Sequence, residues 1–453
     1  MSQPLRIGNA QAFWGDSPDA PARLLMQQPH LDFLTLDYLA EVSLSILAIQ
    51  RERDPSLGYA RDFIEVVRTL LPFWQNGSKI RVVTNAGGLN PEGCARTCLD
   101  ILRSARCDPL KVAVVAGDDV AAHLKGDARN PLFKHLESGK SLTTVADQLV
   151  TANAYLGAPA IAHALNAGAS IVITGRVADP SLTVGPCMHH FGWKLENHDA
   201  LAGATVAGHL IECGTQVTGG FSTDWLATPD PGNIGFPIAE VRADGSCVIT
   251  KPPGTGGEVN ERTVKEQLLY EIGDPGNYLS PDVTLSLLGI DLKTLGKDRV
   301  QVRGAKGRAA TRTYKVSATY RDGFKAHAML TIYGRDAVAK ARRCGTAVFE
   351  KLKRIGVVFE RSEIECLGTG ACAPGVVSQG DEKFMETVLR LSVADSRHEA
   401  VERFTKEIAP LITSGPQGIT GYTGGRPKVQ SVFGYWPCLI EKKKTPPRFR
   451  ILS

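Results

Sequence analysis

Residues 168–180 read G-A-S-I-V-I-T-G-R-V-A-D-P. The apolar run at 170–173 is short, β-branched and bounded by glycine, which predicts a buried parallel strand. In open parallel sheets, ligands bind where the carboxyl ends of the strands open into loops. Thr174, Arg176 and Asp179 follow the apolar run at once, so the sequence predicts a ligand site at this strand end.

The rest of the first half repeats the same pattern of a short apolar strand, a turn rich in glycine and aspartate, and an amphipathic helix. The expected strands are 6–8, 33–36, 80–83, 112–116 and 170–173. Five such units predict an α/β fold with a doubly wound, mostly parallel sheet and right-handed crossovers. A (β/α)8 barrel would need eight units, which the second half does not supply. The segment 145–155 is predicted to be a helix.

The second half does not repeat this strand–turn–helix pattern, and its hairpins followed by helices are typical of an α+β domain. Residues 237–241 and 247–250 flank Asp244-Gly245, which predicts a hairpin. Strands at 314–320 and 326–333 are expected to pair with each other, and a helix is expected at 337–355. A segment rich in proline, aspartate and glycine, 224–234, predicts a boundary between an α/β domain at 1–228 and an α+β domain at 229–453 packed on it.

Composition excludes several classes of protein. An apolar content of 43% and a charged content of 22% over 453 residues indicate a globular protein, and the net charge of +5 is small and dispersed. We therefore expect no nucleic-acid partner. No secretory signal is visible and no apolar run approaches the roughly 20 residues that span a bilayer, so neither a membrane nor export is expected. Ten scattered cysteines without a C-x-x-C motif suit the cytoplasm and argue against a structural metal.

The turn after the third expected strand reads T-N-A-G-G-L-N-P-E-G at residues 84–93. Asn85, Gly87 and Gly88 precede Asn90-Pro91, which predicts the cap and first residue of a helix. Free N–H groups at such a helix start favour an anion, and the alternative is a tight turn without a ligand. Since neither G-x-G-x-x-G nor G-K-[ST] occurs, NAD and ATP are not expected, and we predict no cofactor.

Residues 208–213, G-H-L-I-E-C, place His209, Glu212 and Cys213 on one face of an expected helix. One interpretation is a catalytic cluster, with His209 as general acid or base, Glu212 orienting it, and Cys213 as nucleophile or bystander. The alternative is a helix whose histidine and cysteine are only packed. No further ligands stand at diagnostic spacing, so no metal site is predicted.

Three more features are candidates for substrate binding. Arg176 suits a carboxylate or phosphate through its planar fork, whereas Asp179-Pro180 is either functional or a helix start. Lys251 opens the loop K-P-P-G-T-G-G, and Arg426 lies in the glycine-rich loop G-Y-T-G-G-R-P at residues 421–427. Both loops could cover a ligand at the strand ends or serve only as connections.

Taken together, eight motifs resemble the acyclic terpene utilisation (AtuA-like) family along nearly the whole chain. They are F-W-G-D (13–16), T-N-A-G-G-L-N-P (84–91), T-G-R-V-A-D (174–179), G-H-L-I-E-C (208–213), V-T-G-G (217–220), T-K-P-P-G-T-G-G (250–257), L-Y-E-I-G-D-P (269–275) and T-G-Y-T-G-G-R-P (420–427). Many members carry an additional small C-terminal domain, which we do not expect here. The resemblance implies a catabolic role on branched CoA thioesters, with CoA as part of the substrate.

Two hypotheses follow. In the first, the protein is a lyase or hydratase acting on a branched acyl-CoA thioester or related carboxylate. Catalytic groups would be Asp16, Asp179, His209 and Glu212, and substrate-binding groups Asn85, Gly87, Gly88, Thr174, Arg176, Lys251 and Arg426. In the second, it is a non-catalytic subunit or ligand-binding partner in a CoA-thioester pathway. The expected partner is a small molecule, and a homo-oligomer is compatible with the sequence.

Overall fold

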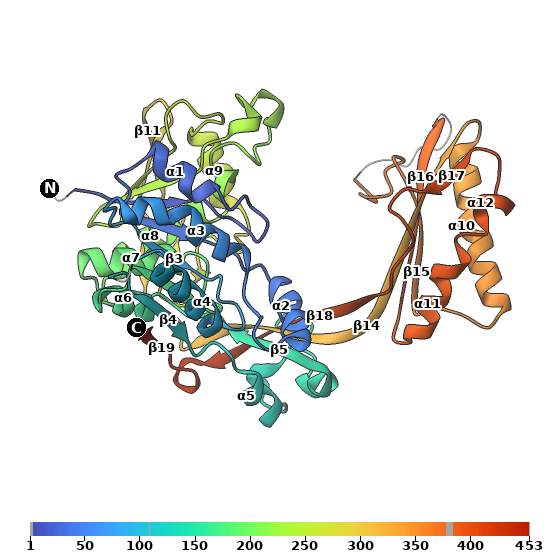
Figure 1. Cartoon of the computed structure of the whole chain (residues 1–453), viewed down its shortest axis with the longest axis horizontal. Helices are drawn as coiled ribbons and strands as arrows, with labels where there is room; N and C mark the ends of the chain where they lie inside the picture. The colour runs from blue at the N-terminus through green and yellow to red at the C-terminus, as the bar shows by residue number, and fades with distance from the viewer. Residues whose placement is uncertain (1–2, 108, 377–383, 453) are drawn as a thin grey trace. The chain divides into compact units, whose positions relative to one another are not determined.

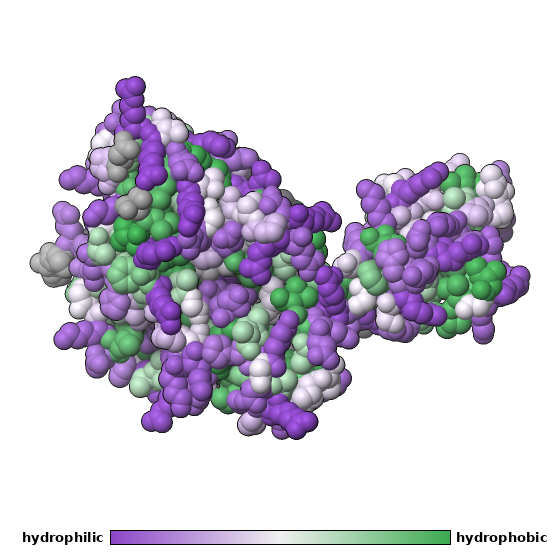
Figure 2. Space-filling view, turned by 60° about the horizontal axis from the view of Figure 1, so that its bottom comes forward, coloured by the Kyte–Doolittle hydropathy of each residue, from purple (hydrophilic) through white to green (hydrophobic). Residues whose placement is uncertain are grey.

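The computed structural model describes residues 3–107, 109–376 and 384–452. Contacts divide the chain into two compact units: unit 1, residues 1–319 and 435–453, and unit 2, residues 320–434. No helix in the described ranges is both long and apolar enough to cross a membrane. In the view of Figure 2, hydrophilic side chains cover most of the visible surface of each unit and hydrophobic ones form separate patches.

The main sheet of unit 1 has five parallel strands at its centre, as the sequence predicts. Its described strands follow the order β11-β12-β8-β7-β1-β2-β3-β6-β4-β19, and β1, β2, β3, β6 and β4 are parallel to one another. The central strands are β1 (Leu5–Asn9), β2 (Phe33–Leu36), β3 (Arg81–Thr84), β6 (Ile171–Thr174) and β4 (Val112–Ala116). The flanking strands are β7 (Ile238–Val241), β8 (Cys247–Thr250), β12 (Arg299–Arg303), β11 (Asp291–Gly296) and β19 (Arg448–Leu452).

Helices cover both faces of this sheet (Figure 1). Leu34 and Leu36 of β2 point into an apolar core with α1 (Ala20–Gln27), α3 (Asp62–Gln75) and α4 (Pro91–Ser104). The neighbouring Phe33 points the other way and contacts α7 through His189, since side chains alternate along a strand. The helices of that face are α6 (Pro159–Asn166), α7 (Ser181–Phe191) and α8 (His198–Glu212). The doubly wound α/β fold is thus confirmed.

Smaller elements complete unit 1. They are α2 (Ser43–Arg53), α5 (Ala121–Gly126), β5 (Leu149–Ala154), α9 (Glu261–Leu269), and a small sheet of β13 (Lys306–Arg308), β10 (Thr284–Ser286) and β9 (Tyr278–Leu279). The hairpin predicted around Asp244-Gly245 is present as β7 and β8. Because β7 pairs with β1, the chain after residue 228 continues the first sheet. The contact units therefore do not divide at the 228/229 boundary that we expected from composition.

Unit 2 is an antiparallel sheet in the order β15-β16-β14-β17, with helices packed on it. Its elements are β15 (Arg361–Leu367), β16 (Glu386–Asp395), β17 (Ile419–Tyr422), α10 (Ala337–Arg354), α11 (His398–Glu407) and α12 (Leu411–Ser414). The long strands β14 (Thr313–Tyr333) and β18 (Gln430–Glu441) contribute residues to both units. Alternate residues of β14, among them Ala328, Leu330 and Ile332, enter the apolar core with α10.

Two local predictions were wrong. Residues 145–155 form a 3-10 turn and β5 rather than a helix, because the segment pairs with β14. The stretches at 314–320 and 326–333 do not pair with each other but belong to the single strand β14. Gly323 has a φ of +81° and passes close to the Asp395 carbonyl, so the strand continues through the expected break while pairing with β16.

Candidate active site

Polar residues follow the carboxyl ends of neighbouring parallel strands and bond to one another. Asp37 follows β2 and Asn85 follows β3, and Asn85 Nδ2 donates to Asp37 Oδ1 at 2.6 Å. Arg176 comes two residues after β6, and its N–H donates to Asp118 Oδ2, beyond the end of β4, at 2.8 Å. The order of the strands thus sets these four residues side by side. The edge that the sequence predicts to carry the site is a polar one.

Arg176 is the central cation of this edge. Its side chain is only 2% exposed, and its guanidinium lies 4.1 Å from the centroid of the Tyr155 ring. Arg176 Nη1 donates to the Leu39 carbonyl and to Asp179 Oδ1, both at 2.7 Å. The N–H of Leu39 in turn donates to Asp37 Oδ1 at 3.1 Å. The backbone of one residue, Leu39, therefore links Asp37 to Arg176, which in turn bonds to Asp179.

Asp37 and Asp179 form a pair of carboxyl groups whose pKa values are both raised. Burial raises the pKa of Asp37 well above its usual range, the charge of Asp179 raises it further, and Arg176 opposes both. Burial likewise raises the pKa of Asp179 against the lowering effect of Arg176, and Asp37 hydrogen-bonds to it. Two neighbouring carboxylates do not both ionise easily, so the pair favours retention of one proton. The Asp179 side chain is 32% exposed, so a ligand can reach that proton.

His209 and Glu212 form a second pair at the end of α8. His209 Nδ1 lies 3.0 Å from Glu212 Oε1, whereas His209 Nε2 and Glu212 Oε2 are buried without a hydrogen-bond partner in the described residues. Burial alone would lower the pKa of His209, but the bond to Glu212 and the charge of Glu212 raise it. Burial raises the pKa of Glu212 to about 7, against the effect of His209. An unpartnered imidazole nitrogen held by a carboxylate is the arrangement of a general base.

The two pairs belong to one group, which we call the carboxyl-edge cluster: Asp37, Arg176, Asp179, His209 and Glu212. Asn9, the last residue of β1, donates from Nδ2 to the Glu212 carbonyl at 3.0 Å and so ties the end of α8 to the same sheet edge. The charge of Asp179 raises the pKa of Glu212, and that of Glu212 raises the pKa of Asp37. The turn after β6 and the His209 segment thus lie together.

Sequence reasoning missed several residues of this site. Asp37 carries the same signal as Arg176, a polar side chain at a strand end, and could have been found. Tyr155, whose hydroxyl donates to Glu41 Oε1 at 2.9 Å, was hidden by the helix predicted at 145–155. The Tyr278 ring lies 6.4 Å from that of His209 and comes from β9, far along the chain, so no local pattern indicated it.

Other predicted residues make contacts elsewhere. Asp16 accepts from the N–H of Ala12 at 2.7 Å and closes its own loop, and the Thr174 hydroxyl donates to the Gly175 carbonyl. Lys251 is buried in an ion pair with Asp298 at 3.3 Å and lines a separate cavity of about 950 Å³. Arg426 is exposed and belongs to unit 2.

The Gly87-Gly88 turn is filled by protein atoms. A Cβ on Gly87 would stand 2.5 Å from the Thr174 carbonyl oxygen, and one on Gly88 would stand 2.3 Å from Leu47 Cδ1. Asn90 caps α4 by accepting from the N–H of Gly93 at 2.9 Å, as predicted. Close packing accounts for both glycines, which favours the tight-turn alternative over an anion cradle.

The Cys213 thiol is poorly suited to act as a nucleophile. Burial raises the pKa of the Cys213 thiol, and the charge of Glu212 raises it further, so the sulfur stays protonated. A protonated thiol is a poor nucleophile, which favours the role of bystander. Within the described ranges, no group of three or more His, Cys, Asp or Glu side chains is arranged to hold a metal ion.

The raised pKa values predict that unit 1 becomes less stable from pH 5 to pH 8. The buried carboxyls Asp37, Asp118, Asp179 and Glu212 keep protons that the unfolded chain releases, so stability falls as pH rises. The stabilisation from His209, whose pKa is raised, is also lost as pH rises. The lowered pKa of His189 has the opposite effect, because this histidine stabilises the folded state more at high pH than at low pH. We expect a net loss of at least about 2 kcal/mol in the free energy of unfolding.

Urea titrations followed by tryptophan fluorescence can measure this loss, because all five tryptophans lie in unit 1. Glu212→Gln removes the carboxyl whose pKa is about 7 and should reduce the difference between pH 5 and pH 8. A free energy of unfolding that is constant or rises over this range would contradict the assignment of proton-holding carboxyls.

Comparison with known proteins identifies the family. A family model described as "Acyclic terpene utilisation family protein AtuA" matches residues 5–451, nearly the whole chain. No curated protein and no solved structure matches the chain. The matched range contains every member of the carboxyl-edge cluster. The chain therefore belongs to the acyclic terpene utilisation family AtuA, whose name associates it with terpene catabolism.

Proposed function

We propose that the protein is a catabolic lyase or hydratase that acts on a branched acyl-CoA thioester, or a related carboxylate, by general acid/base chemistry. The observation that carries this proposal is the position of the proton-holding pair Asp37–Asp179 beside the His209–Glu212 pair. Neighbouring groups whose environments favour different protonation states are what paired acid and base catalysis requires. The family description supports a catabolic role.

In the dehydration direction, His209 Nε2 removes the proton from the carbon next to the thioester carbonyl. The electron pair of that C–H bond forms the C=C bond while the C–O bond to the departing hydroxyl breaks. Asp179 gives the shared proton to the hydroxyl, which leaves as water; hydration is the reverse. Glu212 orients His209 through Nδ1. Arg176 donates to Asp179 and so positions it.

Exposed apolar surface near the cluster supports a substrate that carries an acyl chain. The Phe221 ring, 69% exposed, packs edge-on against Tyr270 with centroids 6.1 Å apart. Burial raises the pKa of Tyr270 to about 12, and the charge of Glu212 is among the further causes, so Tyr270 lies near the cluster. A hydrophobic chain that covers Phe221 would gain burial of apolar area.

Incubation of the purified chain with enoyl- and 3-hydroxyacyl-CoA thioesters tests this function. Absorbance of the conjugated thioester reports turnover, and a thermal shift reports binding. We expect turnover of branched chains in preference to straight chains of equal carbon number. Binding without turnover across the panel, together with copurification of a second protein, would contradict the enzyme and favour the non-catalytic subunit.

A further inference from the structure

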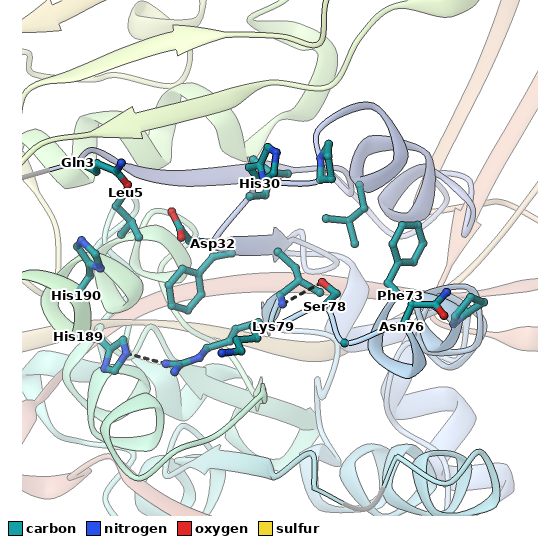
Figure 3. Close-up of a pocket in the computed structure, with 18 residues that line it drawn as sticks. Gln3, Leu5, His30, Asp32, Phe73, Asn76, Ser78, Lys79, His189 and His190 are labelled. Carbon is teal, nitrogen blue, oxygen red and sulfur yellow. Dashed lines mark hydrogen bonds between the residues drawn. The ribbon is translucent and has the colours of Figure 1, made fainter.

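A second cavity, of about 1010 Å³, opens at the opposite edge of the same sheet (Figure 3). Its walls come from the residues before β1, β2 and β3 and from the end of α7. The strands between the two edges have four or five residues and rise about 3.3 Å per residue, so roughly 13–17 Å of sheet separates this cavity from the carboxyl-edge cluster. A ligand here would occupy a different site from the proposed substrate.

The charges of this cavity are mostly positive. Lys79 and Arg81 line it with three histidines, His30, His189 and His190, whereas Asp32 is its one acidic wall residue among those described. The Asp32 carboxylate is itself engaged, because its Oδ2 accepts from the N–H of Arg6 at 2.8 Å. Within the described parts of the chain, no ion pair joins Lys79 or Arg81 to a carboxylate. The cavity thus presents two cations that form no ion pair with its single carboxylate.

Arg81 contacts a neutral ring instead of an anion. Its Nη1 lies 2.7 Å from His189 Nε2, the contact drawn as a dashed line from His189 in Figure 3. Because a guanidinium can only donate, Nε2 accepts, and the ring hydrogen lies on Nδ1 facing Asn166 Oδ1. Burial lowers the pKa of His189, and the charges of Arg81 and His190 lower it further. The contact orients Arg81 but leaves its charge uncompensated.

The wall beside this contact is apolar. Leu5, Leu31 and Phe33 are buried residues that line the cavity. The Arg81 guanidinium lies 5.9 Å from the centroid of the Phe33 ring, and His189 meets that ring edge-on at 6.3 Å. A ligand that reaches Arg81 therefore also meets hydrocarbon.

We propose that this cavity binds an oxyanion, carboxylate or phosphate, that carries an apolar group, with Arg81 and Lys79 as its cationic partners. The planar fork of Arg81 suits either anion, and the apolar wall takes the attached hydrocarbon. We expect ligand binding to be coupled to protonation of His189, because an anion beside Arg81 favours the charged imidazole.

Calorimetric titration of the full chain with hexanoate, hexyl phosphate, inorganic phosphate and hexanol tests the proposal. We expect the two amphiphilic anions to bind at least about tenfold more tightly than hexanol or inorganic phosphate. The tighter of the two identifies the natural anion as a carboxylate or a phosphate. Arg81→Met and Lys79→Met should each weaken binding about tenfold or more. Lys79 is exposed, so Lys79→Met should keep the fold even if Arg81→Met does not.

Two matched controls locate the ligand. Arg335→Met removes a cation that is 93% exposed in unit 2, and Asp179→Asn changes the carboxyl-edge cluster; neither should alter the affinity. Wild-type affinity should rise from pH 8 to pH 6, and His189→Gln should reduce this rise more than His30→Gln or His190→Gln does. Affinity that survives both Met substitutions at the cavity, affinity lost in Asp179→Asn, or no binding at about 10 mM anion would each overturn the proposal.

Discussion

Arg176→Met should lower the free energy of unfolding of unit 1 by about 3 to 5 kcal/mol, the cost of breaking a buried charge pair. The substitution keeps an apolar stem of similar length but removes the donor to Asp179 and to the Leu39 carbonyl. Asp37 and Asp179 then face each other without a cation, and the Tyr155 ring loses the guanidinium stacked on it. Protonation of both carboxyls relieves part of the cost, so the loss should be greater at pH 8 than at pH 5.

Urea unfolding followed by tryptophan fluorescence measures this loss. Arg450→Met is the matched control, because Arg450 pairs with Glu92 on the surface, where its side chain is 59% exposed; a change below about 1 kcal/mol is expected there. Adding Asp179→Asn to Arg176→Met should recover part of the stability, since it removes one unpaired carboxyl. Equal effects for Arg176→Met and Arg450→Met would show that Arg176 does not hold the carboxyl pair.

The central strands of the fold could be predicted because each is encoded by a short stretch of consecutive residues. The central strands other than β1 are short, largely apolar runs followed by glycine or a polar residue, and burial on both faces makes such runs nearly continuous in sequence. β5 was not predicted because its pairing partner, β14, lies more than 150 residues away in sequence. Composition likewise does not reveal that β7 pairs with β1, which is why the contact units do not divide at the expected 228/229 boundary.

Four of the five members of the carboxyl-edge cluster, all except Asp37, could be predicted from the sequence. These four residues, Arg176, Asp179, His209 and Glu212, lie within one stretch of 37 positions. Their residue types alone indicate a candidate site. The link between Asp179 and Asp37 runs through Arg176 and the backbone of Leu39, whose position follows from the neighbouring strand ends. Lys251 shows the converse: a lysine in a glycine-rich loop suggested a ligand contact, but its partner is Asp298.

His209→Ala should lower kcat/KM on the proposed thioester substrate by about 10²- to 10⁴-fold, the contribution of a positioned general base. The side chain carries the one imidazole nitrogen of the carboxyl-edge cluster that is buried without a protein partner, so the proposed reaction has no equivalent base without it. Glu212→Gln should cause a smaller loss, because the amide still bonds to Nδ1, and should shift the pH dependence of kcat. Binding should survive both changes, since the proposed place of the acyl chain is over Phe221 rather than at His209.

His123→Ala is the control for His209→Ala, because His123 is an exposed histidine on α5 and its removal should leave kcat/KM unchanged. Thermal shifts with a non-reactive acyl thioester separate loss of catalysis from loss of fold, since a folded variant that binds is still stabilised by the ligand. If His209→Ala binds the thioester and turns it over at the wild-type rate, His209 is not the base, and the proton must be removed by another group of the cluster, of which Glu212, with its pKa of about 7, is the nearest.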